Sequence, residues 1–323
     1  MKQRMKSSVL KKLEAVIPRL APNFARLSDI EYELAREIKG YSGEKRVDYF
    51  LDELSGRYSI LRGVCLRSQG KKFQIDTLII TGNAIYIVEI KNLSGTITFD
   101  TTLNQFIRDD GEKETGYRHP ITQAQLQQLR LESWLRDWNL KNPPIYYFIA
   151  ISDPATIIKV VGDSSYIGRL VSHGEHIPGK ILEKESEIAR NGGAKIKHIA
   201  LGKAITQAGE EYDYNILKKF GVKEEDIRPG VQCPTCSTLG MVRQYGIWHC
   251  PKCQTQSKNA HSKTLSDFLL LIKPSISNKE CQFFLNVDSR ATVTRILQQS
   301  GLIYEPKTRR WKKQFLDGIP ISQ

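Results

Sequence analysis

Two apolar, β-branched runs separated by a short polar segment are the strongest feature of the hydrophobic pattern. Residues Gln74–Ile80 read QIDTLII, and residues Ile85–Lys91 read IYIVEIK. The Gly82-Asn83 pair between them is a two-residue hairpin turn signal, which sets Ile80 opposite Ile85. Side chains alternate along a strand, and both faces here are mainly apolar, as in a sheet that is covered on both sides. The pattern therefore predicts a buried β-hairpin.

The same register brings charged residues together where this hairpin ends. Counting outward from the turn places Asp76 directly opposite Glu89, and Lys91 shares their face. Most Glu-x-Lys pairs on strands are solvated surface charges, but ionised residues inside a covered sheet are costly without a partner. Opposed like charges are also destabilising. Two carboxylates around a cation, with a lysine to receive negative charge, are the layout of a Mg²⁺-dependent nuclease.

Helix and strand signals flank the hairpin in α/β order. Glu44 opens a predicted helix, and Gln123 heads another before a continuous apolar strand run, 145–151. The two apolar helix stripes are Val47, Phe50, Leu51 and Leu54, and Leu126, Leu129, Trp134 and Leu135. From the residues alone, Glu44 is either a first-turn acid that complements the helix dipole or a site residue. Gln123 is most simply part of a solvated polar face.

An ordered series of motifs over roughly residues 40–150 resembles the nuclease-related domain (NERD) family, which itself resembles the PD-(D/E)XK nucleases. The motifs are Gly43-Glu44, Gln74-Ile75-Asp76, Ile85–Asn92, Ser94-Gly95 and Pro120–Gln123. A series in this order is far more specific than a single Glu-x-Lys. Ile75 stands where a proline precedes the acidic residue in the wider superfamily, and this departure is expected within NERD-like sequences.

The resemblance implies a restriction-endonuclease-like core, with a mixed β-sheet flanked by helices. It implies that Asp76 and Glu89 hold Mg²⁺ or Mn²⁺, helped by the Ile90 carbonyl, and that Lys91 orients water or stabilises the transition state. The resemblance also implies that the two helix residues, Glu44 and Gln123, belong to the site. The expected catalytic set is Glu44, Asp76, Glu89, Lys91 and Gln123.

Two C-x₂-C knuckles separated by thirteen residues are the second strong signal. Cys233, Cys236, Cys250 and Cys253 can place four thiolates tetrahedrally around one Zn²⁺, with a hairpin between the knuckles. A redox pair needs a thioredoxin-like βαβ context, which the pattern lacks, and chance rarely gives two matched knuckles. Four thiolates leave no open coordination position, so a structural zinc ribbon is expected. Cys65 and Cys281 lie in apolar stretches and are typical of buried thiols.

The last sixty-odd residues form a basic unit with three helix signals followed by a small β-wing. The unit resembles a winged helix-turn-helix, without a tight signature, and residues 254–323 hold 11 Lys and Arg against 5 Asp and Glu, or +6. DNA binding is the favoured interpretation, and a solvated basic tail packed on the ribbon is the alternative. The candidate nucleic-acid contacts are Thr292, Arg295, Arg309, Arg310, Trp311, Lys312 and Lys313, with Trp311 for stacking.

Composition sets the remaining limits. The chain of 323 residues carries 48 Lys and Arg against 35 Asp and Glu, a net charge of +13 that favours polyanionic partners such as nucleic acid or an anionic membrane. No apolar run approaches the length of a membrane span, and the N-terminus lacks the apolar stretch of a secretion signal. We therefore expect a cytoplasmic protein with reduced thiols.

The sequence predicts five segments. They are a basic helical extension (1–39), a NERD nuclease-like α/β domain (40–202), a linker (203–230), a zinc ribbon (231–256) and a helix-turn-helix or winged-helix-like DNA-binding domain (260–323). The extension is either a docking helix pair or a solvated lead-in.

The expected function is a Mg²⁺-dependent DNA nuclease that its C-terminal modules place on the substrate. A non-catalytic nucleic-acid-binding platform and an RNA-processing nuclease are the alternatives. The expected partner is DNA, with other DNA-processing proteins as further candidates. No membrane partner is expected, and a homodimer is compatible with the sequence.

Overall fold

The computed structural model describes residues 4–138, 140, 143–192, 195–313, 315–316 and 319–320. The chain divides into two compact units. Unit 1 contains Met1–Ser7 and Arg36–Tyr212, and unit 2 contains Ser8–Ala35 and Asp213–Gln323. The helix α2 (Leu27–Leu51) contributes residues to both units.

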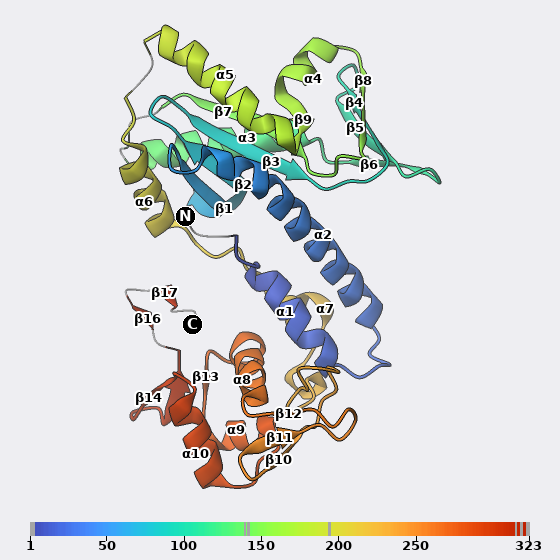
Figure 1. Cartoon of the computed structure of the whole chain (residues 1–323), viewed down its shortest axis with the longest axis vertical. Coiled ribbons are helices and arrows are strands. Elements are labelled where there is room, and N and C mark those ends of the chain that lie inside the picture. Colours follow the sequence, from blue (N-terminus) through green and yellow to red (C-terminus); the bar gives the residue numbers. More distant parts are fainter. Residues whose placement is uncertain are drawn as a thin grey trace. The chain divides into compact units, whose positions relative to one another are not determined.

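Unit 1 is built on a five-stranded mixed sheet with the order β1-β2-β3-β7-β9 (Figure 1). Strands β1, β2 and β3 are antiparallel neighbours, whereas β3, β7 and β9 run parallel. The strands are β1 (Ser59–Ser68), β2 (Lys71–Ile80), β3 (Ile85–Lys91), β7 (Ile145–Ile151) and β9 (Val171–His173). The predicted hairpin is confirmed, since Ile80 pairs with Ile85 and the Thr81 N–H donates to the Ala84 carbonyl over 3.0 Å.

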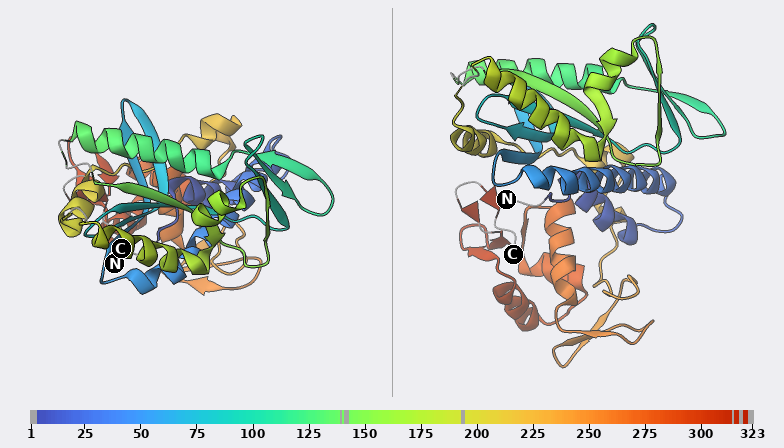
Figure 2. Two further views of the ribbon diagram at one scale, coloured as in Figure 1. Left: turned by 90° about the horizontal axis from the view of Figure 1, so that it is seen from above. Right: turned by 45° about the horizontal axis from the view of Figure 1, so that its top comes forward.

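Helices cover both faces of this sheet, as the apolar hairpin predicts. Helix α3 (Pro120–Asp137) lies on one face, and α5 (Ile177–Arg190) with the C-terminal half of α2 lies on the other (Figure 2). Leu78, Ile80, Ile85 and Ile87 pack in one core with Leu131, Trp134 and Leu135 of α3. Tyr86, Val88 and Ile90 pack in another with Val47 and Leu51 of α2 and Ile181 of α5.

A second, smaller sheet with the order β6-β5-β4-β8 completes unit 1. Its core contains Phe99 and Phe106, which pack with Ile121 and Ala124 of α3. The strands are β4 (Thr96–Asp100), β5 (Gln105–Asp109), β6 (Glu114–Tyr117) and β8 (Ile157–Val161). The other helices of unit 1 are η2 (Asp52–Leu54), α4 (Ser164–Leu170), η3 (Gly174–His176) and α6 (His198–Ala208).

Glu44 does not open a helix, so the expectation that it is a first-turn acid is wrong. It lies well inside α2, which begins at Leu27 and runs through Gly40 and Gly43 without a break. Gly43 has a packing reason, because a Cβ there would lie 2.7 Å from the Ser152 side-chain oxygen and still closer to Asn92. Glycine at this position therefore lets α2 approach the end of β3 closely.

The apolar stripe predicted for α3 is only half right. Trp134 and Leu135 are buried, but Leu126 and Leu129 are 36% and 60% exposed. The buried face carries smaller and polar residues instead, among them Gln127 at 5% exposure. The spacing of the large apolar side chains predicts a different buried face. In the structure the helix is turned so that Gln127 faces the sheet.

Unit 2 combines α1, part of α2, and the C-terminal third of the chain around one core. That core joins Val9 and Leu13 of α1 to Cys233 and Trp248 of the four-cysteine segment and to Phe268 of α8. Its first elements are α1 (Ser8–Val16), η1 (Ile17–Arg19), α7 (Ile216–Phe220), η4 (Glu224–Asp226), β10 (Val242–Gln244), β11 (Ile247–His249) and β12 (Gln256–Ser257).

The end of unit 2 has the element order α8-β13-α9-α10-β14-β15, with a three-stranded antiparallel sheet in the order β13-β15-β14. The elements are α8 (Ala260–Leu271), β13 (Ser275–Ile276), α9 (Asn278–Leu285), α10 (Arg290–Gln299), β14 (Ile303–Glu305) and β15 (Arg310–Lys312), followed by β16 (Phe315–Leu316) and β17 (Ile319–Pro320). None of the helices in the described part of the chain is long and apolar enough to cross a bilayer.

Candidate active site and four-cysteine centre

The acidic pair lies where β2 and β3 cease to pair with each other. The pairing of β2 with β3 ends at Thr77 with Val88, so Asp76 and Glu89 are the next residues beyond the ladder on either strand. The Asp76 carboxylate accepts a hydrogen bond from the Ile90 N–H over 2.8 Å. The main chain of β3 therefore fixes the carboxylate that the opposite strand supplies.

Lys91 and Gln123 join this pair. The Lys91 ammonium donates to Glu89 Oε1 over 2.6 Å and to Gln123 Oε1 over 3.0 Å. Its side chain is 23% exposed, whereas that of Glu89 is 1% exposed. Gln123 is thus not part of a solvated face, because its amide oxygen holds the lysine beside the acidic pair.

Gln127 is a site residue that the sequence did not reveal. Its Nε2 donates to Glu89 Oε2 over 2.7 Å and to the Gln74 carbonyl over 3.0 Å. Its Oε1 is buried and has no hydrogen-bond partner in the described part of the chain. The available signal was its place one helical turn after Gln123, since residues four apart share a helix face.

Glu44 approaches from α2 and is paired with an arginine near the N-terminus. Arg4 Nη1 donates to Glu44 Oε2 over 2.6 Å, and Arg4 Nε donates to Asp48 Oδ2 over 2.7 Å. Arg4 Nη2 also donates to the main-chain carbonyl of Asp76 over 2.9 Å. The guanidinium group therefore connects the acidic face of α2 to the strand that carries Asp76.

The electrostatics show more negative charge than the local cations compensate. Burial and the Asp76 carboxylate raise the pKa of Glu44 to about 8, against the lowering effect of Arg4. Burial and Asp76 likewise raise the pKa of Glu89 to about 7, against the lowering effect of Lys91. Burial raises the pKa of Asp76, although Lys91, the Ile90 N–H and Arg4 act in the opposite direction.

These residues fit a hard divalent cation such as Mg²⁺. Buried, mutually repelling carboxylates with raised pKa values are stabilised when a cation enters, and oxygen atoms are the ligands that Mg²⁺ takes. Among the described residues, the four cysteines are the group of three or more His, Cys, Asp or Glu side chains that could hold a metal ion, so the acidic site offers a smaller set of protein ligands. The carboxylates of Asp76 and Glu89 are the groups that could hold such a cation.

The four cysteines of unit 2 form one cluster, in which all sulfur atoms lie within 4.8 Å of one another. The Cys233–Cys253 and Cys236–Cys250 sulfur atoms are each 3.6 Å apart. Four ligands about 2.3 Å from a tetrahedral metal are separated by about 3.8 Å, so the cluster has the dimensions of a zinc site. The four predicted ligands are brought together and could hold a structural metal such as zinc.

The two knuckles share the same local geometry and the pattern C-P-x-C-x-T. In each, the N–H of the first cysteine donates over 2.9 Å to the carbonyl of a threonine five residues later, Thr238 or Thr255. The residue after the second cysteine adopts a positive φ, 58° at Ser237 and 61° at Gln254. The shared sequence C-P-x-C-x-T encodes this geometry, of which only the cysteines had been recognised as a signal.

The predicted nucleic-acid contacts divide into exposed and internally paired residues. Arg295, Arg309 and Lys313 are exposed. Arg310 instead forms an ion pair with Glu280, and Lys312 forms one with Glu305. Trp311 is 7% exposed and donates from Nε1 to Asn278 Oδ1, so the stacking role expected for it has no support in this placement. Thr292 on α10 is half-buried.

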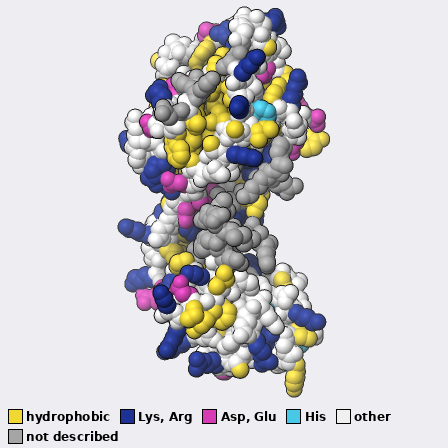
Figure 3. Space-filling view, turned by 90° about the vertical axis from the view of Figure 1, so that its left-hand side faces the viewer, with side chains coloured by type: hydrophobic (Ala, Val, Ile, Leu, Met, Phe, Trp, Pro, Cys, Tyr) yellow, Lys and Arg dark blue, Asp and Glu magenta, His cyan; other side chains and the backbone are white. Residues whose placement is uncertain are grey.

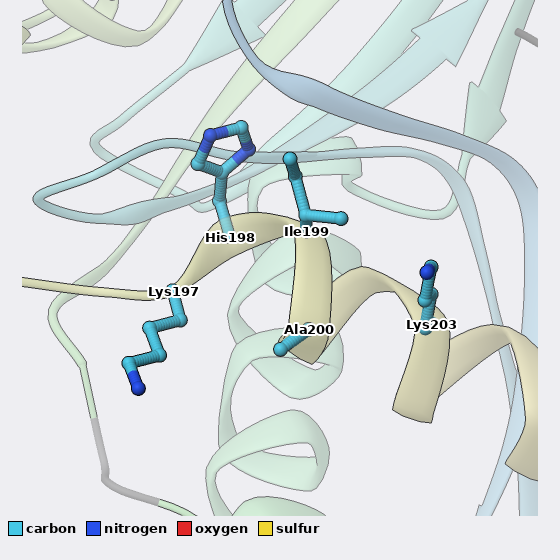
Figure 4. A pocket seen from close by; sticks show the side chains of 5 residues that line it. All are labelled: Lys197, His198, Ile199, Ala200 and Lys203. Carbon is cyan, nitrogen blue, oxygen red and sulfur yellow. The ribbon is translucent and has the colours of Figure 1, made fainter.

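A shallow hollow on unit 1 does not coincide with the acidic site. It is lined by Lys197, His198, Ile199, Ala200 and Lys203 at the start of α6 (Figure 4). His198 Nδ1 lies 3.0 Å from the Ser59 hydroxyl, so the imidazole packs against β1. This hollow is not lined by any of the predicted catalytic residues, which are Glu44, Asp76, Glu89, Lys91 and Gln123.

Comparison with known proteins identifies one family. Residues 39–152 match the family model of the nuclease-related domain, NERD. This confirms the resemblance over the segment that contains Glu44, Asp76, Glu89, Lys91 and Gln123. No curated protein and no solved structure matches the chain.

Proposed function

We propose that this protein is a metal-dependent nuclease that hydrolyses phosphodiester bonds in DNA. The observation that carries the proposal is the convergence of Asp76, Glu89 and Lys91 at the end of one hairpin, with Gln123 holding the lysine. The nuclease-related segment supports a function of this class. An RNA substrate and a non-catalytic role are the alternatives, and cleavage of a mixed substrate panel separates them.

Each residue has a distinct role in this proposal. Asp76 and Glu89 would hold Mg²⁺, which would supply Lewis-acid stabilisation of the phosphate and lower the pKa of a bound water. Asp76 is kept in place by the Ile90 N–H, and Glu89 by Gln127. The partly exposed ammonium of Lys91 donates to the attacking water or to the charge that develops on the phosphate oxygens.

The four-cysteine centre of unit 2 is proposed to carry zinc as a structural ion. A cluster of four thiolates without a fifth donor leaves no site for substrate. Two of its cysteines, Cys233 and Cys250, belong to the core that also holds Trp248 and Phe268. Zinc would therefore stabilise this core rather than take part in cleavage.

Unit 2 is proposed to supply DNA affinity through a winged-helix-like fold. The order α8-β13-α9-α10-β14-β15, with a short turn between α9 and α10, is the arrangement that supports this assignment. Arg290 and Arg295 are exposed on α10, and Lys307 and Arg309 are exposed at the β14–β15 turn. On the face drawn in Figure 3, Lys and Arg side chains are scattered among apolar and acidic ones, so the proposed surface is defined by the four named residues. Exposed cationic side chains of this kind suit contacts to a phosphate backbone.

The test is cleavage of a substrate panel with Mg²⁺ or Mn²⁺: plasmid, linear duplex, single strand, branched DNA and RNA. Wild type runs beside Asp76→Ala, Glu89→Ala and Lys91→Ala, each checked for folding and for DNA retention. Loss of cleavage in all three folded variants is the expected result and identifies the substrate. If the wild type cleaves none of these substrates but binds DNA tightly and in a salt-sensitive manner, the nuclease hypothesis is wrong and the protein is a non-catalytic binding platform.

DNA binding by unit 2 has its own test. Arg295→Gln with Arg309→Gln should weaken binding and reduce the slope of log affinity against log salt by about 2, because each phosphate contact contributes about 0.9. The matched control is Lys223→Gln with Lys252→Gln, which removes the same charge from exposed positions outside α10 and the β14–β15 turn. An equal loss in both double variants would show a diffuse charge effect instead of the proposed surface.

A further inference from the structure

Arg4 is the most extensively bonded side chain around the acidic site, yet it lies outside the nuclease-related segment, residues 39–152. It is 8% exposed. Besides Glu44 and Asp48, it contacts the Asp76 carbonyl over 2.9 Å and the Thr77 hydroxyl over 2.8 Å. A buried guanidinium is costly unless its donors are satisfied, and here three nitrogen atoms are all engaged.

We propose that Arg4 is a positioning residue that fixes Glu44 and the Asp76 segment of β2 relative to each other, so that the site binds its divalent cation. The proposal rests on the proposed nuclease function. Its geometric basis is that a single planar group bonds Glu44 on α2 and the main chain of Asp76 on β2. Partners behind metal-binding carboxylates orient them, and their removal typically weakens metal binding by about 10- to 100-fold.

Simple charge repulsion predicts the opposite effect, which makes the proposal testable. Arg4 is itself a cation beside the expected cation site, so removing its charge would tighten metal binding if Coulomb repulsion decided the outcome. The positioning role predicts weaker binding, because Glu44 and Asp48 would lose their shared donor and the α2 side of the site would no longer be tied to β2.

The experiment measures Mn²⁺ binding to the full chain, loaded with zinc beforehand, through loss of the electron paramagnetic resonance signal of free Mn²⁺. The variants are Arg4→Gln, Arg4→Lys and Glu44→Gln, with Arg4→Gln also combined with Glu44→Gln. The matched control is Arg67→Gln, because Arg67 forms a comparable two-pronged ion pair with Glu210 at an exposed position of the same unit. Circular dichroism and thermal melting confirm that each variant folds.

Arg4→Gln is expected to bind Mn²⁺ about tenfold more weakly or worse, while Arg67→Gln matches the wild type. Arg4→Lys, which keeps the charge but cannot span all the acceptors, should recover part of the loss. If Arg4→Gln does not fold, the test is whether folded Arg4→Lys binds Mn²⁺ more weakly than the wild type does. In the Glu44→Gln background the Arg4→Gln change should weaken binding less than it does alone, because residues that share a contact are not additive.

Two results would overturn the proposal, and they have different meanings. Mn²⁺ binding by folded Arg4→Gln that equals or exceeds that of the wild type would remove the positioning role while leaving the nuclease site intact. If the zinc-loaded wild type binds no Mn²⁺, both the proposed metal site and the role of Arg4 are ruled out. The substrate panel then decides independently whether the chain cleaves nucleic acid.

Discussion

At the scale of single residues, each acidic side chain of the site is held by a donor that is not itself a candidate ligand. The Ile90 N–H holds Asp76, the Gln127 amide holds Glu89, and the Arg4 guanidinium holds Glu44. Donors of this kind fix the orientation of metal-binding carboxylates before the metal arrives, which reduces the cost of organising the site.

Glu89 should make the stability of the metal-free site fall with pH. Its pKa rises from 4.5 to about 7 on folding, so between these values the folded state binds more protons than the unfolded state. The free energy of unfolding should therefore decrease as the pH rises through about 7. Glu89→Gln should flatten this dependence in urea denaturation at pH 5, 6.5 and 8 without added Mg²⁺.

The matched control for this experiment is Glu210→Gln. Its pairing with Arg67 lowers the pKa of Glu210 to about 2, so its titration lies below the tested window and the slope should not change. Added Mg²⁺ should raise the midpoint of the wild type more at pH 8 than at pH 5, since ligands must lose their protons first. An unchanged slope in Glu89→Gln would contradict the assigned pKa.

Gln127→Leu should uncouple Glu89 from α3. The substitution keeps the side-chain size but removes the donor to a carboxylate that is 1% exposed, which should cost about 1–3 kcal/mol at neutral pH. Cleavage should fall by about 10- to 100-fold. Gln125→Leu is the control, because Gln125 is exposed on the same helix and bonds the Tyr147 hydroxyl. Equal effects in both variants would argue against a role for Gln127.

The sequence predicts the acidic pair and the lysine that the structure brings together, but it does not reveal two residues that hold the acidic groups. Asp76, Glu89 and Lys91 were predictable because a turn signal fixes the register, and register is a local property. Gln127 was missed because a polar residue on a helix is read as solvated until its orientation is known. Arg4 was missed because a lone arginine in a basic N-terminal stretch carries no periodic signal.

At the scale of elements, local signals explain which parts of unit 1 were predicted. The hairpin of β2 and β3 has long apolar runs and a definite turn, so its existence and pairing could be predicted. The start of α2 could not, because Gly40 and Gly43 are poor helix formers and suggest a boundary. The short β4–β6 strands mix exposed and buried residues and provide little periodicity.

Gly43→Ala should impair the site without altering any charge. The added methyl group would meet Asn92 and Ser152 and push α2, with Glu44, away from the end of β3. Despite the better helix propensity of alanine, we expect a net loss of about 1–3 kcal/mol and reduced cleavage. Gly40→Ala in the same helix meets nothing within 4 Å and should gain about 0.5–1 kcal/mol.

Thermal denaturation of both glycine variants checks this prediction, with Mn²⁺ binding as the second measurement. Gly43→Ala should show a lower midpoint and weaker binding, whereas Gly40→Ala should show a higher midpoint and unchanged binding. Equal stabilisation of the two variants would mean that the close approach at Gly43 does not constrain the site.

At the scale of the whole molecule, the two units have separate cores, and the cysteine cluster belongs to only one of them. Cys233, Cys250 and Trp248 pack in the same core as Leu265 and Phe268 of α8. The hairpin core of unit 1 contains none of these residues. Loss of the proposed zinc should therefore act on unit 2 first.

Removal of the metal should speed hydrogen exchange in one unit and leave the other unchanged. With EDTA, or in Cys236→Ser, exchange should accelerate in β11 and α8 but not in β3, because Trp248 of β11 and Phe268 of α8 share the core of Cys233 and Cys250, whereas β3 does not. Cys281→Ala is the control, because it removes a buried thiol outside the cluster and the variant should still bind zinc. Equal acceleration in β3 would contradict independent cores.

The 3.6 Å spacing of the sulfur atoms also determines how the cluster would respond to losing its metal under oxidising conditions. Cys233 with Cys253, and Cys236 with Cys250, need to approach by only roughly 1.5 Å to reach the length of a disulfide bond. With peroxide as the oxidant, each pair would give up two protons and two electrons and link one knuckle to the other. The two knuckles would then stay linked, and the cluster could not bind its metal again until a reductant cleaved the disulfide bonds. The effect of a brief exposure to oxidant would therefore outlast the exposure.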